Sequence, residues 1–472
     1  MNTQFEAIHQ YIQDNKKNIT DMLSDLVKIP SVSSEAKEGA MFGENCRSAI
    51  LRVEELLGDI GMDTHTHKDH AYTMGRTKGD GKTIGLFCHA DVVAAVEEDW
   101  VITKPFEPIV KDGFLVGRGV DDNKSGLVNS IWAIKAMQHV GIMPKSSIII
   151  YAGGNEECGM SDLEIFNSEQ PSPDFSFVPD NAYPVCRGEK GIMRFWARFR
   201  TPFKNIISIS GGQSLNIVLG SVDCEMKYSD VLLEQLKKYC DGKNEYTLTS
   251  GNTITLTAKG RSTHAAYSDD SVNALYVLIQ ALKSCDALGD DIKILLEAEK
   301  LVADPFSETV GQGTEDPEFK KTTCTNGIVN TPNGMLNISF DTRYGTEIDI
   351  DAFIEGYRQL LDGMNADIDV TERDDGYVIP KDTPIIQEMT KAWQNITGDT
   401  RESYLSYGGT YARHLKNAVS IGTCIPTATP LDLPDGHGGA HQPAEIIEIE
   451  GLLKSIEVLT QMILKADESL HA

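Results

Sequence analysis

A chain of 472 residues is too long for one ordinary hydrophobic core, so two domains are expected. Its composition, with 40% hydrophobic and 24% charged residues, is that of a soluble globular protein. The formal charge of −27 argues against nucleic acids and anionic membranes as partners, because both would repel it. No stretch approaches the ~20 apolar residues that a membrane-spanning helix needs.

The nine cysteines are scattered, without a C-x-x-C pair, and several lie inside apolar runs. This usage is typical of reduced thiols in the core of a cytosolic protein. The N-terminal residues, MNTQFEAIHQYIQDNKK, contain no continuous apolar signal core. We therefore expect a cytoplasmic protein.

Helical and strand patterns alternate up to about residue 190. Apolar residues at helical spacing predict helices within 5–26 and 50–60. Short apolar runs bounded by turn residues predict strands at 83–88 and 147–151, with a helix at 126–140 between them. This order predicts an α/β fold in which helices cover both faces of a mostly parallel sheet.

The pattern changes after this region. Apolar and polar residues alternate at 192–200 and 253–258, as in antiparallel strands with one face in water. A helix at 271–284, a strand at 335–342 and a helix at 350–361 are expected to follow.

A long helical pattern returns near the C-terminus, at 446–465. The simplest account is one α/β domain, made of residues 1–190 and 381–472, that is interrupted by a smaller α+β insertion. The insertion would comprise residues 191–380.

The predicted strand at 83–88 runs into the triplet His-x-Asp. A strand fixes the direction of its last side chains, so His89 can be held toward a cleft. Asp91, two residues on, lies on the same side and can orient the imidazole, as carboxylates do for metal-bound histidines. Alone the triplet is a weak signal, and its weight comes from the segments that follow it.

Carboxylates follow at three further points of the chain. The segment GRGVDDNKSG places Asp121 and Asp122 just before a predicted helix, where an ordinary N-cap is the simpler interpretation. Glu156 and Glu157 come directly after a predicted buried strand, so one could bind a metal while the other acts as a general base. Asp180 follows another short apolar run.

A glycine-rich loop near the C-terminus, GHGGAHQPAE, adds His441. In this order, the segments HADVV, GRGVDDNKSG, GGNEECG, FVPD and GGAHQPAE resemble the co-catalytic metallopeptidase family. That family includes peptidase V-type dipeptidases, carnosinases, glutamate carboxypeptidases and N-acyl-amino-acid deacylases. The resemblance covers nearly the whole chain, and the segments DNAYPV and GEKG are most similar to the bacterial peptidase V branch. It implies a zinc-peptidase-like catalytic domain with an inserted lid domain.

The resemblance also implies a set of metal ligands. His89 and Asp180 would bind one divalent metal ion, and Glu157 and His441 would bind a second. Asp122 would bridge the two ions.

By the same resemblance, Asp91 would orient His89, and Glu156 would be the general base for the bridging water. Two divalent cations about 3.5–4 Å apart lower the pKa of a shared water and stabilise the developing oxyanion. Histidines and carboxylates without a cysteine suit zinc, manganese or cobalt, and zinc is favoured on affinity alone.

Asp121 is an alternative to Asp122 as the residue that bridges the two metal ions. The family usually has two aspartates and then Lys-Gly after the glycine turn, whereas this chain has Asn123 and then Lys124-Ser125. Sliding the alignment by one residue would make Asp121 the bridge. We prefer Asp122 because that register keeps Lys124 in its usual place.

The insertion carries further residues to which the resemblance gives roles. His264, in the segment GRSTHAA, would reach over from the lid and stabilise the tetrahedral oxyanion. Asn216 and Arg343 would hold the substrate's C-terminal carboxylate, for which the guanidinium fork is suited. Gly408 and Gly409 would line the substrate pocket. The simpler alternatives are a loop histidine for His264 and a strand-surface arginine for Arg343.

The segment DTHTHKDH looks like another metal cluster, because His65 and His67 share one face of an extended stretch. It lies amid polar residues before the apolar strand, and no other segment supports it. We favour a solvated hairpin there.

The motifs and the resemblance together predict a two-metal amide hydrolase, specifically a dipeptidase that acts on dipeptides or very short peptides. In the peptidase V branch that this chain resembles, an enlarged lid closes over the site within one chain, which implies a monomer and a substrate short enough to be enclosed. The alternative within the family is a deacylase or carboxypeptidase. The alternative from another class is an inactive relative that binds peptides, against which the intact Glu156 argues.

Overall fold

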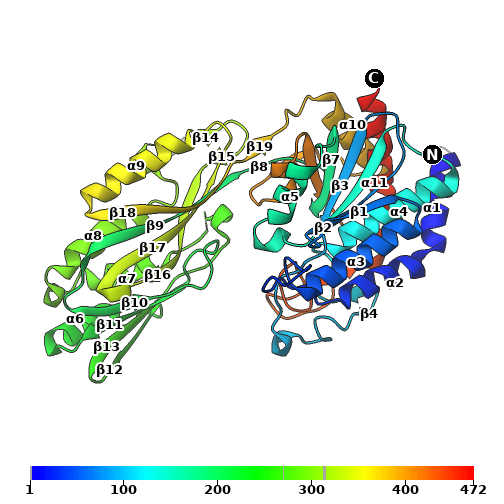
Figure 1. Cartoon of the computed structure of the whole chain (residues 1–472). Coiled ribbons are helices and arrows are strands. Elements are labelled where there is room, and N and C mark those ends of the chain that lie inside the picture. The colour runs from blue at the N-terminus through cyan, green and yellow to red at the C-terminus, as the bar shows by residue number, and fades with distance from the viewer. Residues whose placement is uncertain (1–2, 269, 312–314) are drawn as a thin grey trace. The chain divides into compact units, whose positions relative to one another are not determined.

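The computed structural model divides the chain into two compact units (Figure 1). It describes residues 3–268, 270–311 and 315–472. The first unit comprises Met1–Gly188, Val378–Tyr404 and Thr410–Ala472, and the second comprises Glu189–Tyr377 and Leu405–Gly409. Each unit has its own cluster of buried apolar side chains. Residues 405–409, which lie outside the predicted insertion, group with the second unit.

A mixed sheet forms the centre of the first unit. Its four central strands are parallel, in the order β6 (Ser147–Gly153), β3 (Thr83–His89), β7 (Phe175–Asn181) and β21 (Ala418–Gly422). Every residue of β3 and β6 is buried, as is typical of parallel strands covered on both faces. The predicted α/β fold is therefore confirmed.

Antiparallel strands border these four, so the sheet is mixed rather than mostly parallel. On one side, β2 (Tyr72–Arg76) pairs with β6, and β1 (Asp63–Thr66) pairs with β2. On the other side, β8 (Cys186–Glu189) pairs with β21. The short strands β8, β19 (Tyr377–Val378) and β20 (Tyr404–Ser406) lie where the chain passes from one unit to the other.

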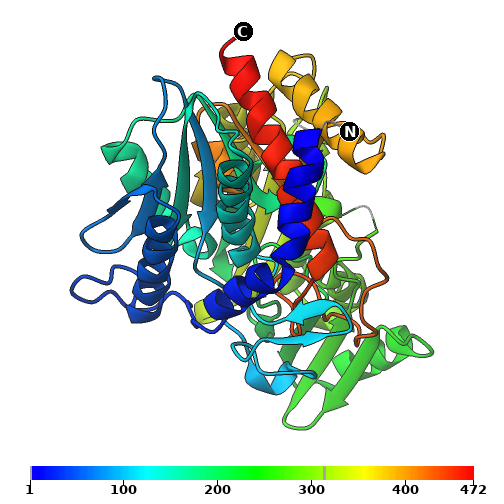
Figure 2. The same ribbon diagram turned by 90° about the vertical axis from the view of Figure 1, so that its right-hand side faces the viewer.

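Helices cover one face of the sheet as a layer. Helix α4 (Lys124–Val140) is buried almost all round, and it contacts β3, α1 (Thr3–Asp14), α2 (Lys16–Val27) and α11 (Ile449–Leu470). Helices α1 and α11, from opposite ends of the chain, lie side by side (Figure 2). Helix α10 (Pro384–Thr397) packs on α11. Among the described residues, no helix has the length and apolar character needed to cross a bilayer.

Aromatic side chains cover the opposite face of β3 and β6. Phe166 of α5 (Ser161–Glu169) packs edge-on against Phe87 and Tyr151, with ring centroids 5.3 and 5.1 Å away. Helix α3 (Glu44–Asp59) packs against β1 and β2. Because side chains alternate along a strand, His89 lies on the same face of β3 as Phe87.

Antiparallel sheets and helices make up the second unit. One sheet has the order β10 (Ile206–Ser210), β11 (Ser221–Lys227), β13 (Thr253–Lys259) and β12 (Tyr246–Ser250). The other has the order β16 (Thr323–Asn330), β17 (Met335–Tyr344), β9 (Gly191–Pro202) and β18 (Ala366–Asp374). A two-stranded sheet pairs β14 (Glu315–Asp316) with β15 (Lys320–Lys321). The helices are α6 (Asp230–Cys240), α7 (Ala274–Leu282), α8 (Asp291–Val302) and α9 (Ile350–Gly363).

Three of the helices predicted from the sequence begin or end at other residues in the structure. The predicted 446–465 helix was wrong at its start, because β22 (Ile446–Glu448) pairs with β5 (Phe114–Val116), which also pairs with β4 (Ile109–Lys111). Helix α7 starts three residues later than predicted, since the Asn273 side chain caps it by accepting a hydrogen bond from the Leu275 N–H at 2.9 Å. The 5–26 region forms two helices that are separated at Asn15.

Candidate metal centre

The ends of three parallel strands supply four of the predicted site residues. His89 is the last residue of β3, and Asp180 is the last but one of β7. Glu156 and Glu157 open a short 3-10 helix, η2 (Glu156–Cys158), that begins just after β6. Neighbouring parallel strands present their carboxyl ends at one edge of the sheet, so these side chains converge there.

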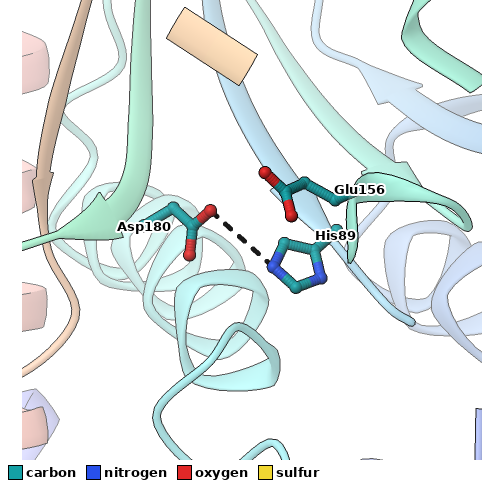
Figure 3. Close-up of side chains that lie close together, drawn as sticks. All are labelled: His89, Glu156 and Asp180. Atoms are coloured by element: carbon teal, nitrogen blue, oxygen red, sulfur yellow. Dashed lines mark ion pairs between the residues drawn. The ribbon is translucent and has the colours of Figure 1, made fainter. Parts of the chain in front are cut away.

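Two groups of metal-binding atoms share His89. His89, Glu156 and Asp180 form one group, whose ligand atoms all lie within 4.8 Å of one another. In Figure 3 the Asp180 and Glu156 carboxylates both point toward the imidazole, whose Nε2 is 3.7 Å from Asp180 Oδ2. His89, Asp122 and Glu157 form the second group by the same criterion.

The carboxylate of Asp122 lies between two histidines that come from distant parts of the chain. Its Oδ1 is 3.0 Å from His89 Nε2, and its Oδ2 is 2.9 Å from His441 Nε2. The same His441 nitrogen is 3.1 Å from Glu157 Oε2. Asp121, the alternative bridge, instead accepts a hydrogen bond from the Thr423 hydroxyl on its Oδ1 at 2.6 Å.

The nearby carboxylates raise the pKa of both His89 and His441. Burial lowers the pKa of His89, but the carboxylates of Asp180 and Asp122 outweigh burial and hold the pKa well above its usual value. Hydrogen bonds with Asp122 and Glu157 raise the pKa of His441 to about 10. Each imidazole therefore binds a proton tightly as long as no other cation faces these carboxylates.

Two acidic side chains of the site, Asp180 and Glu156, also have raised pKa values. Burial raises the pKa of Asp180 to about 7, although the nearby His89 opposes the rise. Burial also raises the pKa of Glu156 well above its usual value; the charge of His89 opposes this rise, and the charges of Asp180, Glu157 and Asp122 add to it. Several partly buried carboxylates at one place favour a compensating cation.

The residues present fit divalent metal ions. Carboxylate oxygens and imidazole nitrogens, without a thiol, are the donors that zinc and manganese accept. Within the described residues, Oε1 of Glu157 is buried and has no hydrogen-bond partner, so it is available to a cation. The two groups around His89 and Asp122 could therefore hold two adjacent ions.

Asp91 makes more contacts than predicted. Its backbone carbonyl oxygen lies 3.0 Å from His89 Nδ1, and its carboxylate Oδ1 is 3.5 Å from the same atom. The carboxylate also accepts the backbone N–H groups of Glu156 and Glu157, each at 3.2 Å. Asp91 thus positions the His89 imidazole and the backbone of both glutamates. Nothing in the local sequence indicated its contacts with the glutamates.

Asn123 is a site residue that the sequence did not identify. Its Nδ2 donates a hydrogen bond to Asp180 Oδ1 at 2.8 Å, and its Oδ1 accepts the backbone N–H of His89 at 3.4 Å. A carboxylate in this place could not donate to Asp180, so the amide is the suitable group. The only available signal was its position next to Asp122.

Five predicted site residues belong to the second unit: Asn216, His264, Arg343, Gly408 and Gly409. The backbone N–H of Ala265 donates to the Asn216 carbonyl oxygen at 2.8 Å, which brings Asn216 next to His264. Burial, and then the charge of Arg343, lower the pKa of His264.

Arg343 is buried, and its guanidinium is already paired. Its Nε and Nη2 lie 2.6 and 3.1 Å from the carboxylate oxygens of Asp341, and its Nη1 donates to the Tyr407 carbonyl oxygen at 3.1 Å. It is therefore not an exposed arginine on a strand surface. Gly408, next to Tyr407, donates its N–H to the Ser406 hydroxyl at 3.1 Å.

The DTHTHKDH segment forms the predicted hairpin edge, because β1 pairs antiparallel with β2. His67 is buried rather than solvated, with its ring 5.8 Å from that of Tyr72. In the part of the chain that the structure describes, neither His65 nor His67 belongs to a group of three converging metal-binding side chains.

Known proteins resemble this chain over nearly its whole length. The model of Peptidase family M20/M25/M40 matches residues 85–465. A Staphylococcus haemolyticus protein named "Putative dipeptidase" is 26% identical over 473 residues, which cover 96% of this chain and 97% of that protein.

Two solved structures show that the fold is shared. The di-peptidase Dug1p of Saccharomyces cerevisiae aligns with a TM-score of 0.59 at 16% identity, over 99% of both chains. Human carnosine dipeptidase 1 aligns with a TM-score of 0.61 at 14% identity, over 98% of this chain and 99% of its own.

Proposed function

Because this chain belongs to Peptidase family M20/M25/M40, we propose that it is a metal-dependent dipeptidase that hydrolyses the peptide bond of dipeptides or very short peptides. The observation that carries the proposal is the Asp122 carboxylate, whose two oxygens lie 3.0 and 2.9 Å from His89 and His441. A carboxylate with one oxygen toward each histidine can bridge two cations. The names of its relatives support dipeptides as the substrate class.

In this proposal each residue has one task. His89 and Asp180 would hold one cation, Glu157 and His441 would hold the other, and Asp122 would bridge them. Zinc is the first candidate, with manganese or cobalt as alternatives. When bound, the two cations lower the pKa of a shared water and stabilise charge on the substrate's carbonyl oxygen.

Glu156 accepts the proton of the attacking water and returns it to the amine that leaves as the C–N bond breaks. Its position supports this role, because its carboxylate points into the group formed with His89 and Asp180 (Figure 3). The Asp91 carboxylate accepts the backbone N–H of Glu156, which fixes the backbone from which the Glu156 side chain extends.

The second unit serves as a lid in this proposal. His264 stabilises the oxyanion, Asn216 and Arg343 bind the substrate's C-terminal carboxylate, and Gly408 and Gly409 line the pocket. The lowered pKa of His264 favours a neutral imidazole, which can still donate a hydrogen bond to an oxyanion. A lid within the same chain makes a monomer sufficient, and we place the enzyme in the cytoplasm.

A panel of dipeptides, assayed beside the same dipeptides with acetylated N-termini, tests the substrate class. With metal supplied, we expect kcat/KM to favour the free dipeptides by about 100-fold or more, since a site that binds an amine rejects its blocked analogue. A preference for the acetylated compounds would replace the dipeptidase with a deacylase or carboxypeptidase. Absence of turnover on both panels would indicate a peptide-binding relative without activity.

A further inference from the structure

A buried ion pair joins the two loops that carry Asp122 and His441. Arg118 Nη1 lies 2.7 Å from Glu445 Oε2, and both side chains are almost completely buried. Arg118 lies four residues before Asp122, and Glu445 lies four residues after His441. The pair is thus at the base of both loops, which are more than 300 residues apart in the chain.

The Glu445 carboxylate also holds the backbone that leads to Asp122. Its Oε2 accepts the N–H of Gly119 at 3.0 Å, and its Oε1 accepts the N–H groups of Asp121 and Asp122 at 2.9 and 3.1 Å. With the contact to Arg118, each oxygen receives two donors. Both oxygens of the Glu445 carboxylate therefore have hydrogen-bond donors within the protein.

Arg118 holds the other loop. Its Nη2 donates to the backbone carbonyl oxygen of His441 at 3.2 Å. Two residues of this loop that are not glycine, His441 and Ala444, have φ values of +64° and +51°. Such left-handed conformations persist where surrounding contacts fix the backbone.

We propose that the Arg118–Glu445 pair is a clamp that fixes Asp122 relative to His441 and thereby sets the affinity for the cation between them. The inference rests on the proposed function for the identity of these two ligands. A site whose ligands are already in place loses little conformational entropy when the cation binds. Arg118 and Glu445 are positioning residues, since they touch the ligands' backbone and not the substrate.

Glu445→Gln tests the clamp with little change in size. The amide nitrogen cannot accept hydrogen bonds, so one pair of donors loses its acceptor. In calorimetric titrations of the metal-stripped protein with zinc, we expect the Kd of one of the two cations to rise about 10- to 100-fold, as for outer-shell partners of metal ligands. The cation that Asp180 binds should be less affected.

Asp291→Asn is a matched control in the second unit. Asp291 is also a buried carboxylate that accepts three backbone N–H groups, those of Lys204, Asn205 and Ile206, at 2.8, 2.6 and 3.0 Å. This substitution should lower the thermal stability of the metal-free protein and leave both Kd values unchanged. If Glu445→Gln behaves in the same way, the pair is merely structural and the proposal is overturned.

Arg118→Lys is a milder second variant in case Glu445→Gln does not fold. Lysine keeps the charge but lacks the fork that reaches Glu445 and the His441 carbonyl together. We expect the same selective rise in Kd, and an unchanged Kd overturns the clamp. The titrations use no peptide, so a wild-type protein that fails to bind two cations would instead overturn the metal assignment of the proposed function.

Discussion

Replacing Glu156 by alanine or glutamine should remove nearly all turnover while both cations stay bound. Neither side chain can accept the proton of the attacking water, and loss of a general base costs about 10²- to 10⁴-fold in rate. The metal site should persist, because the ligands assigned to it are other residues. Measuring kcat on a dipeptide, together with metal content by elemental analysis, checks both halves of this expectation.

Glu157 provides the matched comparison, since it is the adjacent residue on the same short helix η2. Glu157→Ala should weaken the binding of one cation, because this removes a carboxylate whose Oε2 is 3.1 Å from His441 Nε2. A Glu156 variant that keeps a rate near that of the wild type would show that the base is another group.

Asp122→Asn should lose the two-metal site. An amide carries no charge and offers one acceptor oxygen, whereas the proposed bridge needs two oxygens, one toward each histidine. We expect cation affinity to fall by more than the roughly 10- to 100-fold that loss of an outer-shell partner causes. Calorimetric titration with zinc measures this loss directly.

Asp121→Asn is the control that separates the two alignments of this segment. The Oδ1 atom of Asp121 accepts a hydrogen bond from the Thr423 hydroxyl, and an amide oxygen can do the same. This variant should keep both cations with affinities within a few-fold of the wild type. The opposite result, in which Asp121→Asn loses the cations and Asp122→Asn keeps them, would move the bridge to Asp121.

Local patterns were sufficient to predict much of the fold. The strands β3, β6 and β7 are short apolar runs that end at turn residues, and helix α4 is a longer, largely apolar stretch between β3 and β6. The start of the C-terminal helix was predicted wrongly because Ile446–Glu448 pairs with a strand more than 300 residues away. No local pattern encodes such a pairing.

The candidate site, too, could be predicted only in part from local sequence patterns. His89 and Asp180 could be recognised because each lies at the end of an apolar run. The contacts that Asn123 and Glu445 make could not be recognised, since their partners are defined only after distant loops meet. Sequence therefore indicates which side chains can bind metal, while the hydrogen bonds that hold them depend on the tertiary fold.

The most direct test of the two-metal account is to follow dipeptide hydrolysis while a metal-stripped sample is titrated with zinc or manganese. The account predicts that the stripped protein is inactive and that the rate reaches its plateau only when two cations are bound per chain. A full rate with one cation bound, or substantial turnover by the stripped protein, would contradict it.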